Sequence, residues 1–395
     1  MSIEFAERMS KVQKSFIREI LKVTENPEII SFAGGLPNPE SFPVKEIEEA
    51  SQRVLTENGN DVLQYSTTEG YLPLREYIAE RYFKRYGLKV EARDILMTNG
   101  SQQALDLIGK VLVDKGDNII IERPGYLGAI QAFSLYEPVF QSVPVNEEGI
   151  DIEQLENALE LYKPKLVYTV PNFQNPSGIT YSKGNREMVA SALKKHDTIL
   201  IEDDPYGELR FIGQGLPPIK TYLGDNSIML GSFSKIVAPA MRLGWICAKG
   251  EIMEKLVVAK QAADLHTNYY SQRVVHQFLM DNDLENHIKK IRQMYKSQRD
   301  CMVSAIERYF PEEVKSTKPE GGMFIWGTLP EGISSMDLFE LASNENVVFV
   351  PGDSFYDDEK NVNTFRLNYT NSSEEMIEEG IRRLARAITS IIKRK

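Results

Sequence analysis

Short apolar runs alternate with longer segments of helical periodicity through the middle of this chain. The runs are rich in β-branched residues and lie at residues 95–98, 118–122, 139–143, 166–170, 198–203, 227–230 and 243–248. Segments with an apolar stripe separate many of them, at residues 101–113, 126–135, 152–161 and 183–195. Continuous apolar runs are typical of strands that are buried on both faces. The pattern therefore predicts an α/β unit in which helices flank a mostly parallel sheet.

The chain ahead of this unit is read as an arm followed by two helices. Helical periodicity is found at residues 10–24, and Asn26 and Pro27 are expected to end that helix. Further helices are predicted at residues 44–58 and 72–86. Gly87 follows the second of these and is expected to be its C′ glycine.

The last third of the chain predicts a second, smaller α+β unit. Helices are expected at residues 250–263, 269–281, 285–309, 335–344 and 373–393. Strands are expected at residues 314–317, 323–328, 347–350 and 364–369. We therefore divide the chain into an N-terminal arm that is part of the small domain, a large domain and a small C-terminal domain, at residues 1–43, 44–283 and 284–395.

Composition changes this picture little but excludes some functions. The chain has 395 residues, 42% of them hydrophobic, and a net charge of −11, which disfavours nucleic-acid binding. Two cysteines form no disulfide framework, and the four histidines form no cluster with metal-ligand spacing, so we expect no metal site. Neither a secretory signal nor a membrane span is predicted, and we expect a cytoplasmic protein.

Candidate chemistry lies in the loops that follow the predicted strands. In an open α/β sheet, ligands bind beyond the carboxyl ends of the strands. Each loop alone has a simpler explanation, because a serine can cap a helix, Asn-Pro and Asp-Pro can form plain turns, and most lysines are solvated. The side chains in question are polar and are found at Ser101, Asn175, Asp203, Tyr206, Ser232, Ser234, Lys235 and Arg242.

Together these loops offer an amine, a carboxylate, an amide, a phenol and an anion cradle with an arginine. Pyridoxal phosphate needs that set. Its aldehyde requires a lysine, its ring nitrogen a carboxylate, its ring oxygen hydrogen-bond donors, and its phosphate N–H groups, hydroxyls and a guanidinium. Lys235 is the candidate for the aldehyde and Asp203 for the ring nitrogen.

Several motifs in the same order resemble the fold-type I pyridoxal-phosphate aminotransferases of class I/II. Within that group the chain looks most like the kynurenine/2-aminoadipate aminotransferase branch. The resemblance covers nearly the whole chain and is carried by residues 31–37, 63–66, 100–103, 175–178, 203–206, 232–235 and 365–367. It implies a large domain that binds the cofactor, a smaller α+β domain, and transfer of an amino group from an amino acid to a 2-oxo acid.

The resemblance also implies roles for individual residues at the cofactor. Lys235 would form the Schiff base and carry the proton between the substrate Cα and the cofactor. Asp203 would pair with the ring nitrogen, and Asn175 and Tyr206 would bind the ring oxygen. Tyr126 would stack on the ring. The phosphate would be held by Ser101, Gln102, Ser232, Ser234 and Arg242.

Further residues would meet the substrate or the partner subunit. Arg366 would bind the α-carboxylate, with Gly35 and Asn175 also in the substrate site. Tyr65 would reach the phosphate of a second copy, so the resemblance implies a homodimer. Residues 15–20 resemble the mobile N-terminal helix of this branch, in which Arg18 could meet a distal carboxylate. A solvated helix arginine is the simpler interpretation of Arg18.

The specific reaction stays open at this point. The donor could be 2-aminoadipate, an aromatic amino acid, kynurenine or a branched-chain amino acid, and 2-oxoglutarate is the expected acceptor. A pyridoxal-phosphate lyase on the same fold would share Lys235, Asp203 and Tyr206. The aminotransferase-like module of a transcription regulator would require a winged helix before the fold. The arm is too short to hold one, and we disfavour that alternative.

Overall fold

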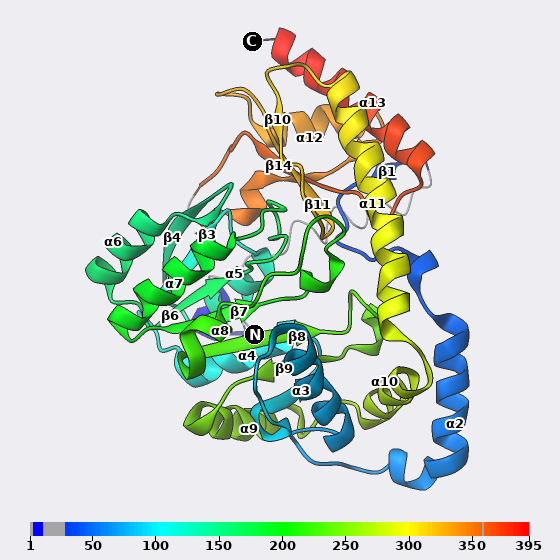
Figure 1. Ribbon diagram of the computed structural model, residues 1–395. Coiled ribbons are helices and arrows are strands. Elements are labelled where there is room, and N and C mark those ends of the chain that lie inside the picture. The colour runs from blue at the N-terminus through cyan, green and yellow to red at the C-terminus, as the bar shows by residue number, and fades with distance from the viewer. Residues whose placement is uncertain (1–2, 11–27, 358, 395) are drawn as a thin grey trace.

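The computed structural model describes residues 3–10, 28–357 and 359–394 (Figure 1). A short 3-10 helix, η1 (Glu7–Ser10), precedes the gap at residues 11–27. The helix predicted over residues 10–24 lies outside the described residues except for its first position, and so does Arg18.

A large sheet forms the centre of the molecule. Eight strands of the described chain pair in the spatial order β2-β9-β8-β7-β6-β3-β4-β5. Neighbours from β8 to β4 are parallel, whereas β9 is antiparallel to β2 and β8, and β5 to β4. The bounds are β2 (Ile95–Thr98), β3 (Asn118–Arg123), β4 (Val139–Asn146), β5 (Gly149–Ile150), β6 (Leu166–Thr169), β7 (Ile199–Asp203), β8 (Ser227–Ser232) and β9 (Gly244–Cys247). The predicted mostly parallel sheet is confirmed.

Helices cover both faces of this sheet, as the continuous apolar strands require (Figure 1). One face packs with α4 (Ser101–Leu112), α5 (Leu127–Ser134) and α9 (Gly250–Asp264). The other packs with α6 (Ile152–Tyr162), α7 (Lys183–His196) and α8 (Lys220–Leu223). Alternate strand residues separate the two cores, so that Ile201 of β7 belongs to the first and Leu200 to the second.

Three further helices extend the large unit at the β2 edge. They are α2 (Val44–Val62), α3 (Leu72–Tyr86) and α10 (Tyr269–Asp281). Helix α3 matches its predicted bounds, and Gly87 adopts φ +66° as its left-handed cap. Helix α2 continues beyond the predicted residue 58, because a kink at Asn58 deforms it without ending it.

The smaller unit is built on an antiparallel sheet in the order β10-β11-β14-β13. Its strands are β10 (Lys315–Ser316), β11 (Phe324–Thr328), β13 (Val350–Pro351) and β14 (Thr364–Asn368). Separately, β1 (Ile30–Ser31) pairs in parallel with β12 (Val347–Val348). The single strand expected at residues 347–350 is therefore two short strands in two different sheets.

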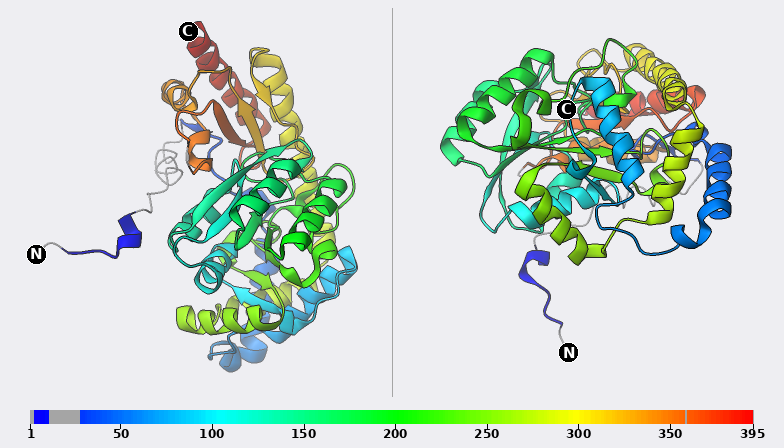
Figure 2. Two further views of the ribbon diagram at one scale, coloured as in Figure 1. Left: turned by 90° about the vertical axis from the view of Figure 1, so that its left-hand side faces the viewer. Right: turned by 60° about the horizontal axis from the view of Figure 1, so that its bottom comes forward.

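Helices α11 (Leu284–Tyr309), α12 (Ser335–Asn344) and α13 (Glu374–Lys393) complete the smaller unit. Figures 1 and 2 show this unit stacked at one end of the large sheet, with α11 running alongside both. Short 3-10 helices occupy several connections, namely η2 (Pro39–Ser41), η3 (Ala92–Asp94), η4 (Gly207–Leu209), η5 (Gly224–Asn226), η6 (Pro239–Met241) and η7 (Gly352–Phe355). Among the described residues, no helix is long and apolar enough to cross a membrane.

Candidate active site

Polar side chains gather where the strands of the large sheet end. Strand β7 ends at Asp203, β8 ends at Ser232 and leads to Lys235, and β6 leads into the loop that holds Asn175. These strands run in the same direction as β2, which leads to Ser101 at the start of α4. Their carboxyl ends therefore lie at one edge of the sheet, as the sequence predicted.

Asp203 is a buried carboxylate with one oxygen engaged and one free. Its Oδ2 accepts a 2.8 Å hydrogen bond from the hydroxyl of Tyr168 in β6. Its Oδ1 is buried and has no hydrogen-bond partner among the described residues. Burial raises the pKa of Asp203 to about 7, although the Tyr168 hydrogen bond opposes that shift. A carboxylate with one vacant acceptor suits a cationic N–H donor.

Lys235 follows β8, the strand that pairs with β7, and the pKa of its amine is lowered. Burial lowers the pKa of Lys235 to about 8, and the positive charges of Arg366 and Arg242 lower it further. The Nζ atom donates a 2.9 Å hydrogen bond to the carbonyl oxygen of Gly35. A neutral lysine amine is the form that attacks a carbonyl carbon.

Arg366 is a residue of the smaller unit that contributes its side chain to the site. From β14 its Nη1 donates a 2.7 Å bond to Asn175 Oδ1, and its Nη2 a 2.7 Å bond to the Ala33 carbonyl. The guanidinium carbon lies 4.3 Å from the ring centre of Phe324 and 5.1 Å from that of Phe355. Burial lowers the pKa of Arg366 to about 10, but the group remains cationic at neutral pH. A guanidinium fork held in this way can bind a carboxylate.

Two phenols, Tyr126 and Tyr206, interact electrostatically with both Asp203 and Arg366. The Nδ2 atom of Asn175 lies 3.4 Å from the Tyr206 hydroxyl. Burial raises the pKa of Tyr206 above its ordinary value and that of Tyr126 to about 12, so both keep their protons. Tyr126 immediately precedes α5 and interacts electrostatically with Asp203 and Arg366.

Residues at the start of β9 and in the loop before it lie around the first turn of α4 and form a cradle there. Gly244 of β9 lies between Ser232 and Thr98 in the strand register, and a Cβ on it would come within 2.9 Å of the Ser101 nitrogen. Arg242 donates a 3.1 Å bond from Nη2 to the Asn99 carbonyl. The N-terminus of α4, with its free N–H groups, thus faces an arginine.

Glycine is required inside this cradle. Gly100 has φ +75°, and a Cβ there would lie 2.7 Å from Arg242 Nη2. Gln102 donates a 2.8 Å bond to the Gly128 carbonyl, and the Ser232 hydroxyl accepts a 3.1 Å bond from the Ser234 nitrogen. The predicted phosphate residues are therefore brought together, but their roles stay predictions.

Two predicted residues are not part of this cluster in the described chain. Tyr65 is 78% exposed and contacts the ring of His266 edge-on, with 5.9 Å between ring centres. Arg18 lies outside the described residues. Sequence reasoning in turn missed Tyr168. A tyrosine inside a continuous buried apolar strand should have been a signal, because its hydroxyl needs a buried partner.

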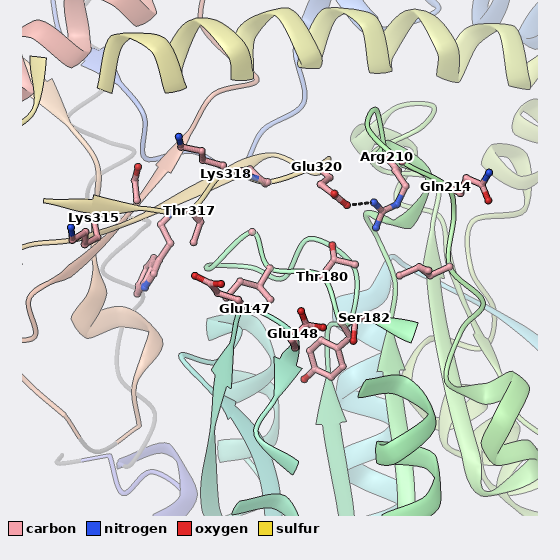
Figure 3. Close-up of a pocket in the computed structure, with 18 of the residues that line it drawn as sticks. Glu147, Glu148, Thr180, Ser182, Arg210, Gln214, Lys315, Thr317, Lys318 and Glu320 are labelled. Atoms are coloured by element: carbon pink, nitrogen blue, oxygen red, sulfur yellow. Dashed lines mark hydrogen bonds and ion pairs between the residues drawn. The ribbon is translucent and has the colours of Figure 1, made fainter. Parts of the chain in front are cut away.

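A separate cavity of about 780 Å³ lies behind the Asn175 loop, between the two units (Figure 3). Gly178 lines one wall and Trp326 of β11 another. Figure 3 shows Arg210 paired with Glu320 at one end of the cavity. The Thr317 hydroxyl donates a 2.9 Å bond to the Ser177 carbonyl, which ties the units together beside Asn175.

Comparison with known proteins points to the family that the sequence motifs resemble. The family model for aminotransferase class I and II matches residues 28–384. Aromatic-amino-acid aminotransferase 1 of Thermococcus litoralis is 45% identical over 99% of this chain and 95% of its own length. The chain therefore belongs to the class I and II aminotransferases.

Solved structures agree in fold over nearly the whole chain. A multiple substrate aminotransferase from Thermococcus profundus superposes with a TM-score of 0.95 at 44% identity and covers 99% of this chain and 98% of its own. The α-aminoadipate aminotransferase of Thermus thermophilus, complexed with N-(5'-phosphopyridoxyl)-L-leucine, has a TM-score of 0.92 at 42% identity, with the same coverage. The predicted class, a pyridoxal-phosphate-dependent aminotransferase of fold type I, is confirmed.

The residues present fit that cofactor. The free Oδ1 of Asp203 can accept the ring N–H, and the lowered pKa of Lys235, about 8, increases the share of its neutral amine. The first turn of α4 and Arg242 can hold a phosphate. The observation that carries the fit is the buried, unpartnered Asp203 oxygen, because a buried acceptor without a donor is rare in a folded protein.

Proposed function

We propose that this enzyme moves the amino group of an L-amino acid of the 2-aminoadipate, aromatic, kynurenine or branched-chain type to a 2-oxo acid, with 2-oxoglutarate as the acceptor. The observation that supports it best is the Arg366 fork, held by Asn175 and Ala33 on the same site as Lys235. The similar proteins named for aromatic amino acids and α-aminoadipate support the donor classes.

We propose cofactor-binding roles that the geometry supports. Asp203 Oδ1 would accept from the ring nitrogen, Asn175 and Tyr206 would donate to the ring oxygen, and Tyr126 would stack on the ring. The phosphate is bound by five residues around the start of α4, namely Ser101, Gln102, Ser232, Ser234 and Arg242. When bound, pyridoxal phosphate supplies an electron sink that stabilises negative charge on the substrate Cα.

The catalytic roles fall on Lys235 and Arg366. Lys235 would hold the cofactor through its ε-amine and would move the proton at the substrate Cα. Arg366 binds the α-carboxylate through two N–H groups and so fixes the direction of the Cα–H bond. Gly35 lines the same space, since its carbonyl accepts from Lys235.

A half-reaction distinguishes this proposal from the lyase alternative. Glutamate alone should convert the bound cofactor to its pyridoxamine form and release one equivalent of 2-oxoglutarate per site. The absorbance change and the released oxo acid are measured together in a single turnover. Failure of every common amino acid to produce the pyridoxamine form would contradict the proposal, and release of a product lacking the α-carboxylate or side chain would favour a lyase.

The donor range is tested at Arg18. We propose that Arg18 meets the distal carboxylate of acidic substrates and moves aside for apolar ones. A donor panel with 2-oxoglutarate should show that Arg18→Ala loses 2-aminoadipate and glutamate selectively. Arg8→Ala, a change of the same charge in the exposed η1, serves as the control and should leave the panel unchanged. Equal losses on acidic and aromatic donors would exclude the Arg18 role.

We also propose a cytoplasmic homodimer in which Tyr65 reaches the partner's phosphate. The exposure of Tyr65 at 78% supports this, because its ring has no buried place in its own subunit. Tyr65→Ala and Lys235→Ala proteins are unfolded together, refolded and assayed. A shared site predicts that the mixed dimer regains activity that neither parent has, since one of its sites combines an intact Lys235 with an intact Tyr65. Mixtures no more active than the parents would exclude sharing.

A further inference from the structure

We propose that Tyr168 is a positioning residue for this reaction. Its hydroxyl keeps the Asp203 side chain ionised and leaves Oδ1 as the oxygen available to the ring nitrogen of pyridoxal phosphate. The inference rests on the proposed role of Asp203, and it assigns to a second residue the task of holding that carboxylate.

The strand register brings the two side chains together. Tyr168 of β6 is paired with Ile201 of β7, and Asp203 lies two residues further along β7. Because side chains alternate between the faces of a sheet, Tyr168, Ile201 and Asp203 share one face. The Tyr168 hydroxyl reaches diagonally across to Asp203 Oδ2 at 2.8 Å. Both residues are buried, with 1% and 2% of their surface exposed.

Tyr168 can act only as a donor to this carboxylate. Burial raises the pKa of Tyr168 well above its ordinary value, and the nearby negative charge of Asp203 raises it further. The hydroxyl therefore stays protonated across the physiological range. Its proton points to Oδ2, so that Oδ1 is left without a donor.

The groups around Asp203 give the carboxylate little other support. Glu122 of β3, Asp204 and the phenols Tyr126 and Tyr206 face it. The first two add negative charge, and the phenols make no hydrogen bond to it among the described residues. Within the described chain, Tyr168 is the donor that opposes the effect of burial on Asp203.

Loss of the Tyr168 hydroxyl should shift a proton from the cofactor ring nitrogen to Asp203. A buried carboxylate without hydrogen bonds favours its neutral form. The nearest acidic proton would be the one on the cofactor ring nitrogen, so a more basic Asp203 would draw that proton away. The hydroxyl of Tyr168 thus keeps the proton on the ring, where it is needed for the ring to act as an electron sink.

The chain offers a matched control in Tyr181. Like Tyr168 it is buried, with 0% exposed, and its hydroxyl donates to a buried carboxylate, Glu122, at 2.7 Å. Tyr→Phe at either position removes a hydroxyl from a buried hydrogen bond to a carboxylate. Of the two hydroxyls, only that of Tyr168 donates directly to the carboxylate proposed for the ring nitrogen.

The test reads the ring nitrogen directly. Wild type, Tyr168→Phe and Tyr181→Phe are each loaded with pyridoxal 5'-phosphate carrying 15N in the ring, and the 15N chemical shift is recorded. Tyr168→Phe should shift the signal toward that of an unprotonated pyridine, whereas Tyr181→Phe should keep the wild-type signal. With glutamate, kcat of Tyr168→Phe should fall by about 10- to 100-fold with little change in KM.

A wild-type signal in Tyr168→Phe, or an equal shift in both variants, would overturn the inference. A wild-type protein whose ring nitrogen is already unprotonated would instead contradict the proposed role of Asp203, and so the two failures are distinguishable. Should Tyr168→Phe not fold, 3-fluorotyrosine at position 168 keeps the ring and the hydroxyl but is a stronger donor. It should keep the 15N signal of a protonated ring nitrogen, and a shift toward that of an unprotonated pyridine would overturn the inference.

Discussion

The Nη1 atom of Arg366 lies 2.7 Å from Oδ1 of Asn175, and this hydrogen bond joins a strand of the small sheet to a loop of the large one. The second guanidinium nitrogen binds the Ala33 carbonyl, which belongs to the N-terminal part of the chain. Two segments far apart in sequence, at Asn175 and Ala33, therefore hold the guanidinium of a third. An arginine fixed in this way needs little reorganisation to bind a carboxylate.

The geometry of this fork predicts the effect of Arg366→Lys. A lysine cannot bind Asn175, Ala33 and a carboxylate with a planar fork, so kcat/KM for the amino donor should fall by roughly 10- to 100-fold. Cofactor affinity should stay unchanged. Single-turnover kinetics of the half-reaction measure the change in kcat/KM. Titration of the cofactor-free protein with pyridoxal phosphate measures cofactor affinity.

Arg210→Lys is a suitable control for that substitution. Arg210 also lies over a phenyl ring, that of Phe173 at 4.8 Å, and pairs with Glu320, but it lines the cavity of Figure 3. Its replacement should leave kcat/KM close to wild type. An equal loss in both variants would mean that Arg366 acts through general packing of the two units.

Lys235 should titrate near pH 8 in the cofactor-free protein. Burial lowers its pKa from 10.5 to about 8, and Arg366 and Arg242 contribute to that shift. Trace acetylation at a series of pH values, read by mass spectrometry, gives the pKa of this amine with exposed lysines as the internal reference. Arg366→Gln should raise the midpoint, because a neighbouring positive charge is removed. A midpoint at the value of the exposed lysines would contradict the burial of Lys235.

The same shift predicts how stability depends on pH. The pKa of Lys235 is lower in the fold than in the unfolded chain, so charging Lys235 disfavours the fold below about pH 8. This penalty is relieved as the pH rises from about 8 to 10.5. Lys235→Met removes it. The stability gain of that variant over wild type, measured by urea unfolding without cofactor, should therefore be largest below pH 8 and shrink above it.

The side chain of Glu208 should contribute strongly to stability. It follows the Tyr206 loop and forms ion pairs with Arg81 and Arg85 of α3, in which all three side chains are less than one-fifth exposed. Removing one partner of a buried ion pair costs about 3–5 kcal/mol, and Glu208→Gln should approach that range. Glu80→Gln, on the same helix, breaks an exposed pair with Lys84 and should cost less than about 0.5 kcal/mol.

Low pH should remove the contribution of Glu208 to the free energy of unfolding. Burial alone would raise its pKa, but the two arginines outweigh burial and hold the pKa below its ordinary value of 4.5. The stabilisation is therefore present above pH 4.5 and is lost as the pH falls through the lowered pKa. The difference in free energy of unfolding between wild type and Glu208→Gln should shrink accordingly in urea titrations at acid pH.

Gly231→Ala should disrupt the core beneath the site. Gly231 of β8 is paired with Trp245 of β9, and a Cβ on it would overlap the indole ring. Overpacking of this kind costs about 1–3 kcal/mol or more. Gly184→Ala in α7 is the contrasting change, because a Cβ there meets open space, and it should stabilise the protein by up to about 1 kcal/mol. Thermal unfolding of the two variants should shift in opposite directions.

Most helices and buried strands could be predicted because their signals are local. The apolar stripe of α3 and its terminal Gly87 set both ends of that helix. The two-residue strands β1 and β5 carry no periodicity and were missed. The run at residues 347–350 looked like one strand, since sequence alone does not show that β12 pairs with β1 while β13 pairs with β14.

The residues of the candidate site could be named, but their contacts could not. Strand ends placed Asp203 and Lys235 at one edge, because parallel strands share a direction. The bond from Arg366 to Asn175 depends on how the small sheet meets the large one, which no local pattern encodes. The role of Tyr168 was missed although its signal is local. Tyr168 lies within an apolar run, and that run was interpreted only as a buried strand.

The pairing of β1 with β12 has a consequence for synthesis on the ribosome. Residues 30–31 belong to the small unit, yet their partner strand is made only after the whole of the large sheet has emerged. The early segment therefore has no strand partner while the large unit is being made. Arg366 follows later still, so a nascent chain could acquire Asp203 and Lys235 in their folded setting before it contains the arginine that we propose to bind the substrate.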